Sequence, residues 1–225
     1  MNEGGFTAAI HRYVDPGETL GEVLFGLIMV LTFTVGARLL TGEDGLDTHQ
    51  LIVGAIGCNV AWGVIDGTLF ALDSLFKRSR RARFYRGLKS AGSGPQALAA
   101  LREEFGLEDE PLTIQQEDRL RLYQSMLVLS DHAQLARVGL RARDFVSACV
   151  IVVLVSATAL PGVVPLLLIK DPNQALRVSN FVLIGLLFIV GYWWAQYTDA
   201  RPWSVGATIT LLGLSLVLVA VLLGG

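Results

Sequence analysis

Three polar residues in the second apolar run of the sequence are spaced so that one face of a helix would carry them all. Asn59, Asp66 and Asp73 follow one another at seven-residue intervals, and two turns of an α-helix return nearly to the same side. Asp66 lies ten residues before the end of the run, which places it about 15 Å deep in a bilayer. A charged side chain at that depth costs on the order of 3 kcal/mol, so it should face the protein interior, a partner or water. The stripe predicts a transport path; the alternative is that Asp66 hydrogen-bonds or caps a neighbouring helix.

The first apolar run carries a second set of possible ion ligands. Glu18 and Glu22 are four residues apart at its start, and Met29 follows Glu22 by seven residues, with Thr32 nearby. A carboxylate, a thioether and a hydroxyl can together bind a divalent ion such as Fe²⁺ or Mn²⁺. We therefore predict a path through Glu22, Met29, Thr32 and the stripe of the second run, with Glu22 and Asp66 as the metal ligands. The alternative is that Glu22 extends to the membrane interface and Met29 packs against lipid.

Two charged clusters lie between the second and third apolar runs. One is basic and directly follows the second run, where it suits anionic lipid headgroups; its members are Lys77, Arg78, Arg80, Arg81 and Arg83. The other is acidic and could collect cations before they enter a pore, although a solvated acidic loop is the commoner meaning of such a cluster; its candidate ligands are Glu103, Glu104, Glu108, Glu110 and Glu117.

The elements that would position these residues are membrane-spanning helices. Of the 225 residues, 52% are hydrophobic and 17% are charged, whereas soluble domains carry about 25% charged residues. The apolar residues gather in runs, and roughly 20 of them cross a hydrocarbon core. Four runs reach that length and one is short, which predicts five spans or, as the alternative, four spans and an interfacial helix. The runs cover residues 23–40, 51–76, 145–169, 178–197 and 203–223.

The distribution of charge predicts the topology. Thirteen of the 18 Lys and Arg residues lie between Lys77 and Arg143, and such residues stay on the cytoplasmic side of a membrane. We therefore expect the N-terminus inside, the C-terminus outside, and a cell-membrane location of the bacterial inner-membrane kind. The fold class is all-α: residues 1–76 hold the N-terminal tail and two spans, residues 77–143 a small cytoplasmic helical domain, and residues 144–225 the last three spans.

The inserted segment shows helix signals of its own. Gln96 to Phe105 reads as a short helix ended by Gly106. A second helix should follow, with an apolar stripe at Leu120, Tyr123 and Leu127. A further helix is expected from Asp131 through Leu135 and Leu140 into the third span. In that span, Pro161 and Pro165 should bend or open the helix.

Motifs of soluble enzymes are absent, so we do not expect an enzyme. No Gly-rich phosphate loop, G-x-S-x-G, H-E-x-x-H or C-x-x-C motif occurs in the sequence. Cys58 and Cys149 fall inside apolar runs and are interpreted as buried small apolar residues rather than a disulfide or a metal pair. The expected partner is the lipid bilayer, and no nucleic acid is expected.

The layout of the chain resembles that of the vacuolar iron transporter family, because both have five spans and a helical domain between the second and third. Residues 21–34 and 54–67 are also similar to bacterial membrane proteins placed near that family. The resemblance implies a homodimer that exports Fe²⁺ or Mn²⁺ from the cytosol in exchange for protons. It also implies that the first two spans line the path and that the inserted domain gathers metal on Glu and Met side chains. The sequence departs from the family pattern where Gly21-Glu22 stands in place of an Asp-Gly pair.

The leading hypothesis is thus a transporter of divalent metal coupled to protons, with Fe²⁺ or Mn²⁺ as the transported ion rather than a resident cofactor. The alternative is a membrane scaffold or sensor that does not transport and whose cytoplasmic helices bind a partner or anionic lipid. A small membrane enzyme is the weakest possibility, because no pair of nucleophile and base is visible.

Overall fold

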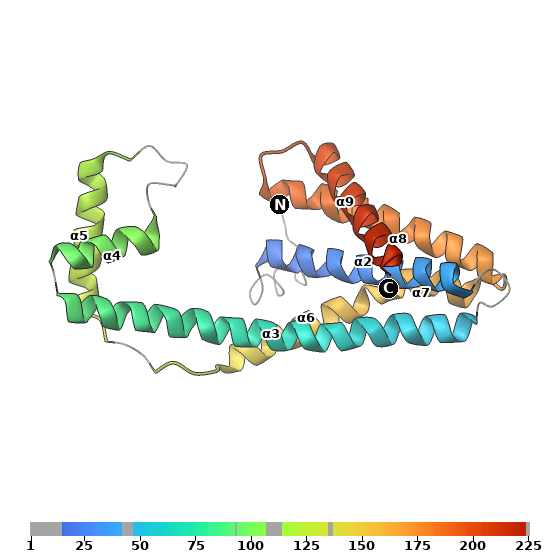
Figure 1. Ribbon diagram of the computed structural model, residues 1–225, viewed down its shortest axis with the longest axis horizontal. Helices are drawn as coiled ribbons and strands as arrows, with labels where there is room; N and C mark the ends of the chain where they lie inside the picture. Colours follow the sequence, from blue (N-terminus) through green and yellow to red (C-terminus); the bar gives the residue numbers. More distant parts are fainter. Residues whose placement is uncertain (1–14, 42–46, 93, 107–113, 135–136, 224–225) are drawn as a thin grey trace, which may run out of the picture. The chain divides into compact units, whose positions relative to one another are not determined.

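The protein is built from helices, and its described residues contain no strand. The computed structural model describes residues 15–41, 47–92, 94–106, 114–134 and 137–223. Five helical stretches are long and apolar enough to cross a membrane, which confirms an all-α integral membrane protein. In chain order (Figure 1), the elements are α2 (Pro16–Thr41), α3 (Thr48–Ala91), α4 (Pro95–Phe105), α5 (Gln116–His132), α6 (Ala142–Ala157), α7 (Ala159–Leu168), α8 (Pro172–Trp194), the 3-10 helix η1 (Ala195–Tyr197) and α9 (Pro202–Leu222).

The described residues fall into two compact units. Those of Met1–Ala71 and Arg141–Gly225 form the membrane unit, and those of Leu72–Leu140 form the inserted unit. Helix α3 contributes its first half to the membrane unit and its last turns to the inserted unit, so the basic stretch continues the helix of the second span. No residue between them breaks the helix, because the stretch from Leu72 to Lys89 contains only one Gly and no Pro.

The core of the membrane unit forms around α2. Leu24, Leu27 and Leu31 recur at intervals of three and four residues, which places them on one face of the helix, and all three are buried. They pack against side chains of the later spans, among them Val163 of α7 and Leu187 of α8. This stripe explains why α2 folds as a span although its apolar run is short.

Small residues allow α3 to approach α6 closely. A Cβ atom on Gly63 would lie 3.0 Å from the carbonyl oxygen of Val152, and one on Gly67 would lie 2.7 Å from that of Ala148. Between membrane helices, small residues four apart permit such backbone contact, which supplies the van der Waals packing that holds the helices together. By contrast, a Cβ on Gly57 of the same helix would meet nothing within 4 Å.

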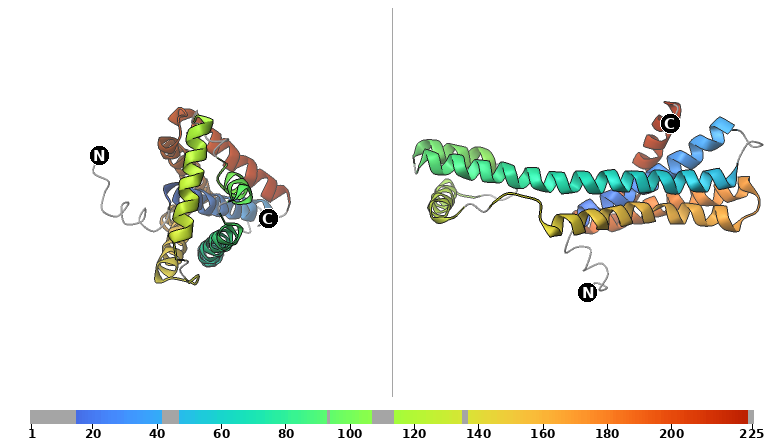
Figure 2. Two further views of the ribbon diagram at one scale, coloured as in Figure 1. Left: turned by 90° about the vertical axis from the view of Figure 1, so that its left-hand side faces the viewer. Right: turned by 90° about the horizontal axis from the view of Figure 1, so that it is seen from below.

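The third span is divided, as its prolines predicted. Helix α6 ends at Ala157, Thr158 links it to α7, and Pro165 lies inside α7; the two helices can be followed in Figure 2. Proline has no N–H group, so Pro161 cannot donate to the carbonyl of Ala157 and the regular ladder of hydrogen bonds is interrupted there. Close to the break, the buried hydroxyl of Ser179 of α8 donates to the carbonyl oxygen of Gly162 at 2.7 Å and joins α8 to α7.

The inserted unit has its own small core. Its buried apolar side chains come from α3, α4 and α5, and the predicted stripe of α5 contributes Tyr123 and Leu127. The predicted end of α4 is confirmed, because Gly106 adopts φ 46° and its N–H group donates to the carbonyl oxygen of Arg102. These contacts make Leu72–Leu140 a packed unit rather than a linker.

The prediction of a helix from Asp131 into the third span is wrong. Helix α5 ends at His132, residues 137–140 are not helical, and α6 begins at Ala142; Leu135 lies outside the described residues. The ammonium group of Lys89 donates to the carbonyl oxygens of Asp131 and Ala133. This side chain takes the place of the N–H groups that a continuing helix would supply, so α5 can end there.

The close contact of α3 with α6 predicts unequal effects for two identical substitutions. We expect Gly67→Ala to lower the free energy of unfolding by about 1–3 kcal/mol, because the new methyl group overpacks against the backbone of α6. Gly57→Ala should leave stability unchanged or raise it by up to about 1 kcal/mol, because alanine favours the helix. Thermal unfolding in detergent, followed by circular dichroism, compares the two; equal effects would contradict the packing.

Candidate ion path in the membrane unit

Two carboxylates predicted as metal ligands come together from α2 and α3. The negative charges of Asp66 and Glu18 both act on the carboxylate of Glu22, and the effect of Asp66 is the larger. Glu22 and Asp66 are each partly buried. The sequence could place the two residues only on separate helices, and it is the packing of these helices that brings the charges within reach of each other.

Neither carboxylate is neutralised by a described side chain. The ion pairs found among the described residues involve neither Glu22 nor Asp66. One oxygen of Asp66, Oδ2, is buried and has no hydrogen-bond partner within the described part of the chain. Two like charges in a medium of low dielectric constant repel each other strongly, and a bound cation or a proton relieves that repulsion. The pair can therefore hold a cation or a proton.

Two further members of the predicted path belong to α2. Met29 and Thr32 are both partly buried, and Met29 lies two turns, or about 10 Å, along the helix from Glu22. No group of three or more His, Cys, Asp or Glu side chains gathers to hold a metal within the described ranges. A metal at Glu22 and Asp66 would thus need ligands of other types, such as a thioether, a hydroxyl, water or groups from a second copy.

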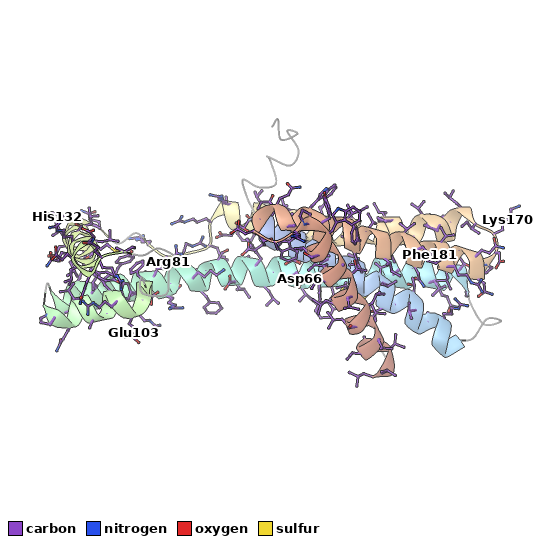
Figure 3. The ribbon with its side chains drawn as sticks, turned by 90° about the horizontal axis from the view of Figure 1, so that it is seen from above. Asp66, Arg81, Glu103, His132, Lys170 and Phe181 are labelled. Carbon is purple, nitrogen blue, oxygen red and sulfur yellow. The ribbon has the colours of Figure 1, made fainter. Side chains whose placement is uncertain are left out.

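The stripe of Asn59, Asp66 and Asp73 has three different environments. Asn59 is fully buried, and its amide nitrogen contacts Gly26, Val155 and Thr158. Asp73 is exposed, pairs with Lys77 at 2.7 Å and belongs to the inserted unit. Asp66, marked in Figure 3, is partly buried, and it is the member whose charge acts on Glu22. Helical spacing predicts a shared side of α3, but the neighbours of each residue decide its chemistry.

The acidic residues that the structure describes in the inserted unit do not gather into one site. Glu103 (Figure 3) and Glu117 are exposed, whereas Glu104 accepts two hydrogen bonds from the guanidinium group of Arg80, at 3.0 and 3.2 Å. Glu108 and Glu110 lie outside the described residues.

The predicted basic patch is likewise partly occupied by contacts within the unit. Lys77 pairs with Asp73, Arg78 donates to the carbonyl oxygen of Gly139 at 3.3 Å, and Arg80 binds Glu104. Arg81 and Arg83 are exposed on α3.

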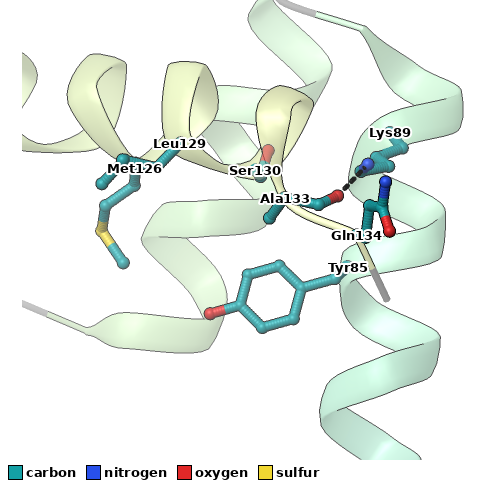
Figure 4. Close-up of a pocket in the computed structure, with 7 residues that line it drawn as sticks. All are labelled: Tyr85, Lys89, Met126, Leu129, Ser130, Ala133 and Gln134. Carbon is teal, nitrogen blue, oxygen red and sulfur yellow. Dashed lines mark hydrogen bonds between the residues drawn. The ribbon is translucent and has the colours of Figure 1, made fainter. Parts of the chain in front are cut away.

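The inserted unit also contains a pocket that the sequence analysis did not identify. Its volume is about 350 Å³, near the lower end of the roughly 300–1,000 Å³ usual for small-molecule sites. Its lining is mostly apolar. Figure 4 shows Tyr85 and Lys89 of α3 on one side and Met126 and Ser130 of α5 on the other. Each pair is four residues apart, a helical spacing that indicates a shared face but not which faces meet.

The two cysteines are free thiols, as interpreted from the sequence. Cys58 is partly buried and Cys149 is exposed on the surface of the membrane unit. The expectation that both are buried is therefore wrong for Cys149.

The five apolar helices of the described residues define a multi-pass membrane protein. The model of the VIT family matches residues 79–225 of the chain. No curated protein matches the chain. The chain therefore belongs to the VIT family, a family of membrane metal-ion transporters rather than classical enzymes. The matched region covers the end of α3, the helices of the inserted unit and the last three spans; Glu22 and Asp66 precede it.

The ion pair between α3 and α4 predicts that Glu104 is not a free metal ligand. In a double-mutant cycle with Arg80→Ala and Glu104→Ala, we expect a coupling free energy of about 0.2–1 kcal/mol, because the pair is bidentate but largely exposed. Unfolding of the purified chain by guanidinium chloride in detergent measures it. Strictly additive effects would show that the two side chains act independently.

Proposed function

We propose that this chain transports a divalent metal ion, iron or manganese, across the membrane in exchange for protons. The observation that supports this function is the pair formed by Glu22 of α2 and Asp66 of α3, which lie close enough for the charge of Asp66 to act on Glu22. Carboxylate oxygens suit Mn²⁺ and Fe²⁺, and intramembrane carboxylates commonly serve ion paths. Membership of a family of metal-ion transporters agrees with this chemistry.

Each residue of the path has a separate task. Glu22, near the start of α2, receives the ion, and Asp66 holds it deeper in the membrane. Met29 and Thr32 add a thioether and a hydroxyl along α2. A metal ion and a proton relieve the same repulsion between the carboxylates, so the two compete for the pair and can be exchanged across the membrane.

A homodimer completes the site. Two carboxylates provide too few ligands for a transition metal, and the described residues contain no group of three or more His, Cys, Asp or Glu side chains that could hold one. A second copy of the chain that contributes its own α2 and α3 would double the number of carboxylate ligands. We place the N-terminus in the cytoplasm and the C-terminus outside, in a bacterial inner membrane, because most Lys and Arg residues lie in the inserted unit and its flanks. Glu103 and Glu117 would then collect metal on the cytoplasmic side.

The proposal predicts that Asp66→Asn abolishes metal flux. We expect entry of Fe²⁺ or Mn²⁺ into proteoliposomes to fall at least about tenfold, because the amide keeps the shape but removes the charge that binds the ion. An internal pH dye should record proton movement in the opposite direction for the wild type and none for the variant. Glu22→Gln should slow flux in the same assay.

Asp118→Asn is the matched control, because Asp118 is an exposed carboxylate of α5, in the inserted unit, that pairs with Arg121. It should transport as the wild type does. Asp73→Asn tests the extent of the path: loss of flux would extend it to the end of the predicted stripe, and normal flux would end it at Asp66. Normal flux through Asp66→Asn would refute the proposed ligand.

The second candidate function is a scaffold or sensor that binds anionic lipid, and the exposure of Arg81 and Arg83 on a continuous helix favours it. This function predicts that anionic nanodiscs slow hydrogen exchange of residues 77–91 relative to neutral ones. The double variant Arg81→Glu and Arg83→Glu should remove that protection. Reversing the charge of the exposed Arg102 and Arg121 to glutamate should leave that protection unchanged. Equal hydrogen exchange of residues 77–91 in anionic and neutral nanodiscs would count against the function.

A further inference from the structure

Three oxygen atoms from different parts of the chain converge on one buried point where the third span is divided. The side-chain nitrogen of Asn59 lies 3.3 Å from the carbonyl oxygen of Gly26, 3.2 Å from that of Val155 and 2.9 Å from the hydroxyl oxygen of Thr158. Gly26 belongs to α2, Val155 to the last turn of α6, and Thr158 is the link to α7. Asn59 reaches this point from α3 and is fully buried.

The amide nitrogen of Asn59 lies among more oxygen atoms than its two hydrogens can reach at once, although the carbonyl oxygen of Val155 also accepts from the N–H group of Thr158 at 3.2 Å. A primary amide has two N–H hydrogens for the three oxygens around it. The hydroxyl of Thr158 already donates to the carbonyl oxygen of Val155 at 2.6 Å, so its own oxygen is left to accept. The amide oxygen of Asn59, Oδ1, is buried and has no partner among the described residues. Oxygen atoms so crowded in a dry interior create a negative potential that favours a cation.

Asn59 can present either of its ends to this point. Rotation of the amide by 180° about its last torsion exchanges oxygen and nitrogen with almost no change of shape. With the nitrogen inward, the amide donates to the oxygens; with the oxygen inward, Asn59 becomes a fourth oxygen ligand. The same side chain can thus close the cluster by itself or open it to a cation.

The helix break adds to the preference for a cation. The C-terminal end of α6 at Ala157 carries a partial negative charge and the N-terminal end of α7 at Ala159 a positive one, so it is the local carbonyl oxygens rather than a helix dipole that favour a cation here. Pro161 cannot supply the hydrogen bond that the carbonyl of Ala157 would receive in a continuous helix. Ends of broken membrane helices with freed carbonyl groups coordinate Na⁺ and similar ions in transport proteins.

We propose that this cluster is a binding site for a small monovalent cation such as Na⁺, held by Asn59, Thr158 and the carbonyl oxygens of Gly26 and Val155. All four ligands are neutral, hard oxygen atoms without a thioether, imidazole or carboxylate, which distinguishes the site from the divalent-metal path. The site stands apart from the proposed function, because its residues and its ion are different and its occupancy does not require divalent-metal transport.

Gly26 is what permits the oxygens to come together. A Cβ atom at this position would lie 2.1 Å from the hydroxyl oxygen of Thr158, closer than any real contact, so a larger residue would push the link away. Gly185 of α8 offers the contrast, because a Cβ there would meet nothing within 4 Å. The two glycines therefore form a test pair: one shapes the cluster and the other does not.

The test is thermal unfolding of the purified full chain in detergent, in NaCl and in choline chloride of equal concentration. A ligand that binds the folded state raises the Tm with its concentration, and we expect a saturable rise of at least about 2 °C with Na⁺ over choline. Thr158→Val removes the hydroxyl oxygen and keeps the shape, so it should abolish the rise, whereas Thr158→Ser should retain it. Gly26→Ala should abolish the rise and Gly185→Ala should not.

The outcomes separate a cation site from a packing contact. Equal Tm values in Na⁺ and choline for the wild type would overturn the proposal, as would a full Na⁺ response in Thr158→Val. If Thr158→Val and Gly26→Ala do not fold, retention of radioactive Na⁺ by the wild-type chain decides: about one ion per chain, displaced by unlabelled Na⁺ but not by choline, supports the site, and no retention overturns it. Divalent-metal flux is not needed for any of these readouts, so failure of the transport proposal would be seen separately.

Discussion

The packing of α2 against the other spans is the constraint on which the membrane unit depends. Its leucine stripe buries against α7 and α8, and its Gly26 carries the closest approach to the third span. On another side, Phe25 meets Trp62 of α3 edge to face, with ring centroids 5.8 Å apart. A hydroxyl of α2 completes the set, since Thr34 donates to the side-chain oxygen of Asn180 at 2.8 Å. Because helices in lipid gain no hydrophobic free energy from meeting, such close contacts and polar bonds must hold them together.

The same helix carries the candidate path, so packing and function are joined. Glu22 lies on α2 within electrostatic reach of Asp66 on α3, and the geometry of the pair depends on how these two helices are held. Asn59 contributes to that by binding the backbone of α2 and of α6 from α3. One polar residue of α3 thus positions helices while another, two turns away, faces a charge.

The inserted unit shows how charge can serve structure before it serves function. Arg80 and Glu104 join α3 to α4, and Lys89 caps the end of α5 through backbone carbonyls. Charged residues that the sequence alone does not distinguish therefore differ in the structure: some form contacts within the unit, whereas Arg81, Arg83 and Glu103 are exposed. A ligand or lipid in contact with this unit would meet the second group.

The sequence by itself determined the five apolar runs, the divided third span and the stripe of α5, because these follow from local length, from proline chemistry and from helical period. It also singled out Glu22 and Asp66, since carboxylates are rare and costly in an apolar run. Only the tertiary structure decided that the charge of Asp66 lies within reach of Glu22. It also decided that Asn59 bonds to α2, to α6 and to Thr158, and that Arg80 forms an ion pair with Glu104. Such contacts join residues far apart in the chain, and a helical period indicates which face a residue shares but not what that face will touch.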